Sequence, residues 1–277
     1  MISALIRWIS PLVILLPLAA AGGERLPDGL VTMGQRDIAA AWLTGPSRIY
    51  GHGVLGDAIE ATGLAVKMRD GRDLSYRQRG ASVFEDRRAR LADLDGDGRD
   101  EIIVVRSYLA RGAALAVFRV VGNRLEWVTE TPPIGVAHRW LNPAGVADFD
   151  GDGRLELVLV VTPHIGGILK IYQLRRDRLV EEWRAPGFSN HAMGSCNLNL
   201  ALLISGRDQP VLVLPNARRT GLAQGFLQGR RLRGRRSAAS PRLAHHHAGG
   251  KKVDTYGRVE VTYTLENGTA GSVRLNF

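Results

Sequence analysis

The sequence contains very little that can form a covalent cross-link, because Cys196 is its only cysteine among 277 residues. A disulfide within one chain is therefore excluded, and so is the class of small secreted scaffolds held together by cysteines. A chain of this length can bury a sizeable core without such cross-links. The sequence also lacks a G-x-S-x-G elbow, an H-E-x-x-H pair and a phosphate-binding glycine loop. These absences favour a non-enzymatic role without excluding an enzyme.

Long apolar runs are almost absent too. The exception is Trp8–Leu18, which follows Arg7, is interrupted by two prolines and precedes the small residues Ala19–Ala21. This arrangement predicts a cleaved secretory signal over residues 1–21. The run is short for a membrane span, although an uncleaved anchor is the alternative. We expect a mature chain of residues 22–277 with no membrane span, secreted or periplasmic.

Acidic residues are missing from Gln209–Val253, whereas basic ones are concentrated there. This segment contains ten Lys and Arg residues. Their number equals the formal net charge of the whole chain, +10, so the remainder of the chain has no net charge. A basic arm for anionic partners is one interpretation. Aromatic residues that would stack on bases are missing around the lone Phe226, so no specific nucleic-acid partner is expected. The basic residues are Arg218, Arg219, Arg230, Arg231, Arg233, Arg235, Arg236, Arg242, Lys251 and Lys252.

Two other interpretations of this region remain open. Regular strand patterning stops near Arg219 and resumes at Val253, which is typical of a disordered insert. A local shift of the reading frame in the gene, through what should be a final repeat, would also produce a sequence rich in Arg, Ser, Ala and His. We therefore describe residues 218–252 as an irregular basic segment.

Against this background, one acidic motif occurs twice. L-A-D-L-D-G-D-G-R-D-E-I-I-V-V begins at Leu91 and V-A-D-F-D-G-D-G-R-L-E-L-V-L-V begins at Val146. We number the motif positions from its first aspartate, Asp93 or Asp148. Carboxylates at positions 1, 3, 5 and 9, with a main-chain carbonyl at position 7, form the oxygen-only shell that Ca²⁺ prefers. The sequence therefore predicts two calcium sites. Their expected ligands are Asp93, Asp95, Asp97, Arg99 and Glu101, and Asp148, Asp150, Asp152, Arg154 and Glu156.

These turns are not EF-hand loops. An EF-hand needs a bidentate Glu at position 12 and a helix on each side. Position 12 is Val104 in one copy and Leu159 in the other. The following runs, Ile102–Val105 and Leu157–Val161, are short, apolar and rich in β-branched residues, which predicts buried strands.

The spacing of the motif predicts a repeated architecture. Asp93 and Asp148 lie 55 residues apart, and the similarity continues into second strands in which Phe118 corresponds to Tyr172. Third strands and Pro/Gly linkers follow in both copies. Three or four short strands in each repeat of roughly 40–60 residues are typical of a propeller blade. Because a single blade cannot bury both faces of its sheet, neighbours are required.

At these residues the sequence resembles a known family. The D-x-D-G-D-G-x-x-E loops are similar to FG-GAP/VCBS repeats of integrin-α-type β-propellers, over about Leu91 to Leu214. The resemblance implies calcium binding between the strands of a blade. Integrin-type loops often carry Asp at the ninth position, and the Glu here retains a carboxylate. The stretches F-E-D-R-R-A-R-L-A-D-L-D-G-D-G, R-W-L-N-P and T-P-H-I-G-G resemble small secreted bacterial FG-GAP proteins.

The expected fold is therefore an all-β propeller of about four to five blades with the irregular basic insert near the C-terminus. Residues 34–87 form a divergent blade with a hairpin turn at Asp70-Gly71. Two calcium blades cover 88–143 and 144–200. A degenerate blade without a metal covers 201–277, and it ends in a hairpin.

Histidines recur beside these elements. We expect His52, His164 and His191 to lie in ligand-facing loops. His138 is a fourth histidine that lies beside a predicted strand. We expect a binding module for an extracytoplasmic protein or glycan. The alternative is a hydrolase or lyase that uses the histidine-bearing face as a metal or general-base site. Convergence of His52, His164 and His191 within about 5 Å would favour the enzyme.

Overall fold

The computed structural model describes residues 23–204, 209–228, 231–233, 251–253, 258–264 and 270–276. These residues form strands β1 to β20 and no helix, and every strand pairs with its neighbours in antiparallel fashion. The expected all-β class is confirmed. In this part of the chain, no helix has the length and apolar character needed to cross a membrane. The predicted signal segment lies outside the described residues.

The first sheet has nine strands. It combines two meanders, β1–β4 and β6–β9, which β5 joins through the pair Ala61 and Phe84. Its strands are β1 (Thr32–Met33), β2 (Ile38–Ser47), β3 (Glu60–Met68), β4 (Asp73–Arg77), β5 (Ser82–Phe84), β6 (Arg90–Ala92), β7 (Glu101–Tyr108), β8 (Gly112–Val121) and β9 (Arg124–Glu130).

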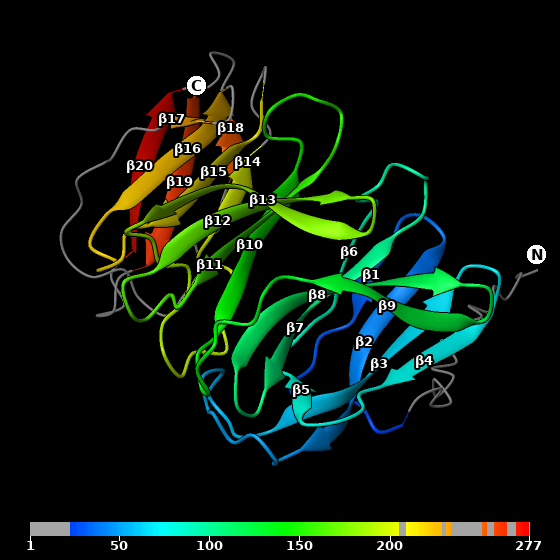
Figure 1. The fold of residues 1–277 in the computed structure, drawn as a ribbon. Coiled ribbons are helices and arrows are strands. Elements are labelled where there is room, and N and C mark those ends of the chain that lie inside the picture. The colour runs from blue at the N-terminus through cyan, green and yellow to red at the C-terminus, as the bar shows by residue number, and fades with distance from the viewer. Residues whose placement is uncertain are drawn as a thin grey trace, which may run out of the picture.

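Three smaller sheets follow in chain order. A four-stranded sheet contains β10 (Leu141–Ala147), β11 (Glu156–Val161), β12 (Ile168–Arg175) and β13 (Arg178–Pro186). The next contains β14 (Leu202–Ile204), β15 (Val211–Pro215), β16 (Leu222–Gln228) and β17 (Arg231–Arg233). The last has three strands, β18 (Lys251–Val253), β19 (Arg258–Thr264) and β20 (Ala270–Asn276). In Figure 1 the sheet of β10–β13 lies between the first sheet and β14–β20.

The central strand of each repeat buries both of its faces. Ile102 and Val104 of β7 pack in one cluster with Leu64 and Val66 of β3. The alternate residues of β7, including Ile103, pack in a second cluster with Leu157 and Leu159 of β11. Side chains of a strand alternate between its faces. The apolar run of β7 therefore packs on the first meander of its own sheet with one face and on the next sheet with the other.

The same pattern continues along the chain. Val158 and Val160 of β11 lie in a cluster with Leu212 of β15, on the face opposite Leu157. Val213 of β15 then packs with Val261 of β19. Continuous apolar runs are what strands buried on both faces require. The core is thus a series of layers between successive sheets.

The register confirms the alignment of the two repeats. Phe118 of β8 pairs with Ile102, and Tyr172 of β12 pairs with Leu157. Ile102 and Leu157 both occupy position 10 of the acidic motif. The hairpin expected at Asp70-Gly71 is also present, between the paired strands β3 and β4.

Two features differ from the sequence-based expectation. Strands β16 and β17 lie inside residues 218–252, where we expected no regular pattern. The reason is that β16 is held by backbone pairing with β15, which the irregular sequence pattern of this segment does not indicate. The second feature is the segment 187–201, which returns to the first sheet. Arg87 Nη1 donates to the carbonyl of Cys196 at 2.5 Å, and Arg88 Nη2 donates to Asn199 Oδ1 at 2.8 Å.

Candidate functional site

Each acidic motif forms a tight turn that closes a hairpin. The first joins β6 to β7 and is closed by the pair Ala92 and Glu101. The second joins β10 to β11 and is closed by Ala147 and Glu156. Both turns therefore precede a central strand at the same register, as the repeat of the sequence motif requires.

The first Asp of each turn folds the backbone around its own carboxylate. Asp93 accepts hydrogen bonds from the N–H groups of Gly96 and Gly98, at 2.8 and 3.0 Å. Asp148 accepts the equivalent bonds from Gly151 and Gly153, at 2.7 and 2.9 Å. All four glycines have positive φ, between 79° and 87°. Glycine adopts this conformation without steric cost, which explains the D-G-D-G pattern.

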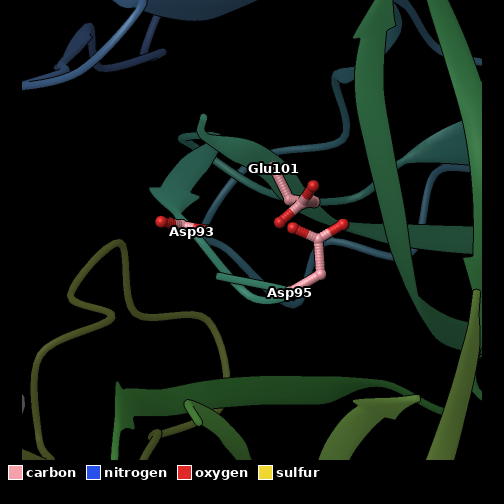
Figure 2. Close-up of side chains that lie close together, drawn as sticks. All are labelled: Asp93, Asp95 and Glu101. Atoms are coloured by element: carbon pink, nitrogen blue, oxygen red, sulfur yellow. The ribbon is translucent and has the colours of Figure 1, made fainter. Parts of the chain in front are cut away.

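Three carboxylates of each turn gather in space. Oxygen atoms of Asp93, Asp95 and Glu101 lie within 4.8 Å of one another, and Figure 2 shows these side chains around the turn. The second turn gathers Asp148, Asp150 and Glu156 in the same way. These are the residues at positions 1, 3 and 9 of the motif.

The other predicted ligands lie on the same turns but outside these groups of three. Asp97 accepts the N–H of Arg99, and Asp152 accepts the N–H of Arg154, both at 2.8 Å. Both arginines are exposed. The position 5 carboxylates thus help to shape the turn by accepting the backbone N–H of position 7.

The ninth position is buried. Glu101 accepts the N–H of Leu94 at 2.8 Å, and Glu156 accepts the N–H of Phe149 at 2.7 Å. Burial raises the pKa of both carboxyl groups to about 7, and these hydrogen bonds oppose part of that increase. A buried carboxylate among other carboxylates is costly unless a cation compensates it.

The residue opposite this glutamate differs between the turns. Gln173 pairs with Glu156, and its Nε2 donates to Glu156 Oε1 at 2.9 Å. Arg119 follows Phe118 and so occupies the equivalent position at the first turn. Its Nη2 lies 3.1 Å from Asp95 Oδ2. Neither residue could be identified from the sequence, because the place of each beside the turn depends on strand register and not on the motif.

Histidines form a separate cluster. The acidic turn precedes β11 and His164 follows it, and the six residues of that strand span roughly 20 Å. His164 Nε2 lies 2.8 Å from His191 Nδ1, with Trp140 beside both rings. His191 Nε2 donates to the carbonyl of Ser195 at 2.7 Å, so its Nδ1 accepts from His164. Burial lowers the pKa of His164 to about 4.

His52 belongs to a different part of the cluster. Its Nδ1 lies 2.6 Å from Oε1 of the buried Glu85, and its ring is 5.3 Å from that of His138. Trp140 Nε1 donates to the carbonyl of Glu85 at 2.9 Å, which connects the two halves.

A convergence of His52, His164 and His191 would have favoured the enzyme, and the structure brings only His164 and His191 into direct contact. His164 and His191 have ring centroids 5.1 Å apart. Within the described ranges, the only sets of three potential metal-binding side chains that gather within 4.8 Å are the two acidic ones. Glu85 and Trp140 complete the cluster. Both residues lie in stretches that resemble FG-GAP proteins, Trp140 in R-W-L-N-P and Glu85 in F-E-D-R-R-A-R-L-A-D-L-D-G-D-G, but the sequence did not indicate that they meet the histidines.

The comparison with known families agrees with the acidic turns. The model of the FG-GAP-like repeat matches residues 93–159, from the first Asp of one turn through the other turn into β11. The chain therefore carries FG-GAP repeat sequence in this region. No curated protein matches the chain.

Proposed function

We propose that this FG-GAP repeat protein is a secreted or periplasmic, calcium-stabilised β-propeller that acts as a binding module. Its ligand would be an extracytoplasmic protein or glycan. The observation that carries the proposal is the pair of turns in which three carboxylates gather at the same register before a central strand.

The donor set fits a hard divalent cation. It is made only of oxygen atoms, and each set includes a glutamate of which 2% or less is exposed to solvent. Ca²⁺ binds such oxygen sets and tolerates irregular geometry. Asp93, Asp95 and Glu101 would hold the first ion, and Asp148, Asp150 and Glu156 the second. The bound ion would relieve the repulsion between carboxylates and fix each turn against its strand.

The layered packing supports the propeller. Antiparallel meanders that stack face to face, each central strand buried between two neighbours, are the packing that blades require. The clusters on the two faces of β7 and β11 have this arrangement. The binding role would use the loops at the strand ends opposite the acidic turns, where His164 is partly exposed and covers the buried His191 and Trp140.

Thermal unfolding with and without calcium tests the proposal. Ca²⁺ should raise Tm and EDTA should lower it, because an ion that binds only the folded state stabilises it by mass action. The double variant D95A/D150A should have a lower Tm in calcium and no response to EDTA. An equal response to EDTA in both proteins would contradict calcium binding at the turns. A pull-down from culture supernatant, with and without calcium, tests the binding module.

One contact favours a second candidate, an extracytoplasmic hydrolase or lyase. The carboxylate of Glu85 orients the imidazole of His52, as in a general-base pair. An activity on model esters or glycosides that is lost in H52A, with the fold intact, would support this candidate. An activity that persists in H52A would contradict it.

A further inference from the structure

The two acidic turns have the same backbone hydrogen bonds but a different electrostatic environment. In each, the first Asp accepts two glycine N–H groups and the buried Glu accepts one N–H seven residues earlier in the chain. Any difference in ion binding must therefore come from the side chains around the turns. The register places Arg119 at the first turn where Gln173 stands at the second.

Arg119 lies on the carboxylates of the first turn. Its Nη2 is 3.1 Å from Asp95 Oδ2, and its Nε is 3.7 Å from Glu101 Oε1. Arg36 adds a second cation, 3.6 Å from Asp93. Each of the three gathered carboxylates of this turn therefore has a guanidinium within 4 Å. A divalent ion must compete with these charges for the same oxygen atoms.

The second turn has a neutral amide in that place. Gln173 Nε2 donates to Glu156 at 2.9 Å and approaches Asp152 Oδ2 at 3.2 Å. The nearby cation, Arg175, bonds instead to the Gln173 side-chain oxygen, at 2.7 Å. In the described part of the chain, no Lys or Arg forms an ion pair with the carboxylates of this turn, unlike the first.

Arg119 also has an acceptor outside the turn. Its Nη2 lies 2.9 Å from Oδ1 of Asp177, in the β12–β13 turn of the next sheet. Asp177 has a positive φ of 62°, so its position is set by the tight two-residue turn between the strands. A guanidinium released from Asp95 and Glu101 can therefore remain paired with the neighbouring sheet.

We infer that Arg119 is a countercation that makes the two turns unequal, so that Ca²⁺ fills the second turn first and enters the first as Arg119 withdraws from Asp95 and Glu101 while it stays paired with Asp177. This inference rests on the proposed calcium binding. It assigns different roles to the sites. An ion in the second turn stabilises only its own hairpin. An ion in the first turn also strengthens the ion pair of Arg119 with Asp177, which joins two successive sheets.

Calorimetric titration with Ca²⁺ in two backgrounds tests this inference. D150A leaves the first turn to be measured alone, and D95A leaves the second. We expect the second turn to bind more tightly than the first. R119Q should tighten the first turn on the order of tenfold, and Q173R should weaken the second by a similar factor. D177N should weaken the first turn about threefold, because Arg119 then has fewer acceptors elsewhere. R184Q, which removes an exposed arginine paired with Glu181, is the matched control and should change neither constant.

The possible failures can be told apart. If the unsubstituted protein takes up no Ca²⁺, the proposed function itself is wrong. If both turns bind Ca²⁺ but R119Q and Q173R leave the dissociation constants within twofold, only the role of Arg119 is wrong. Circular dichroism of each variant establishes that the fold is retained before its constants are compared.

Discussion

Glu156 accepts the backbone N–H of Phe149 at 2.7 Å while its other oxygen, Oε1, receives the amide of Gln173. The carboxyl group that closes the second turn is thus buried and hydrogen-bonded, yet it carries no compensating cation of its own. Its pKa is raised to about 7 by burial. The stability of this turn should depend on whether the carboxylate is neutralised.

Replacing this carboxylate by its amide should have opposite effects with and without calcium. At pH 8 in EDTA, E156Q should raise the free energy of unfolding by about 1 kcal/mol, because it removes a buried charge. With saturating Ca²⁺, E156Q should be less stable than the unsubstituted protein, since the second ion loses a ligand. Urea unfolding under both conditions measures the effect. Destabilisation of equal size in both would indicate a purely structural glutamate.

The glycines of the acidic turns should resist substitution because of their backbone conformation. Gly153 has a φ of 83°, and a Cβ added there would meet nothing within 4 Å. G153A should therefore cost about 1–2 kcal/mol of stability through left-handed strain alone. In the control G145A, in β10, the added Cβ would make ordinary contacts at 3.8 Å without a positive φ, and stability should change little. Equal losses in the two variants, measured by chemical denaturation, would contradict this explanation.

The partly buried His164 should make the protein sensitive to acid. Its pKa is lowered from 6.5 to about 4 by burial, with Arg219 and His52 adding to the effect. As the pH falls from 6.5 to 4, the unfolded chain gains a proton that the folded chain does not. The free energy of unfolding should fall over this window by about 1–3 kcal/mol. In H164Q, measured in EDTA over the same range, this part of the decrease should be absent. A decrease of the same size in H164Q would show that other groups cause it.

Much of the fold could be predicted because the local signals agree. Aspartates at alternate positions of a turn require glycines between them, because the backbone there has positive φ. The apolar runs after each turn are continuous, as strands buried on both faces require. The match of Phe118 with Tyr172 was visible for the same reason, since both copies keep the same spacing. The family model matches residues 93–159, which lie within the resemblance found over about Leu91 to Leu214.

The rest depends on contacts between distant residues. The position of Arg119 over Asp95 follows from the pairing of β7 with β8, which no motif encodes. The contact of Arg87 with Cys196 joins residues 109 positions apart through a side chain and a backbone carbonyl. Whether the three histidines meet could not be predicted either, because the partner of His52 is Glu85, which lies 33 positions away in the sequence. Of the expected irregular segment 218–252, residues 229, 230 and 234–250 lie outside the described residues.

Calorimetric titration of the calcium-depleted, unsubstituted protein is the decisive test of calcium binding at the acidic turns. We predict uptake of two Ca²⁺ ions per chain, one for each acidic turn, and no measurable uptake in D95A/D150A. An absence of binding heat at any Ca²⁺ concentration, or an uptake that persists unchanged in D95A/D150A, would contradict it.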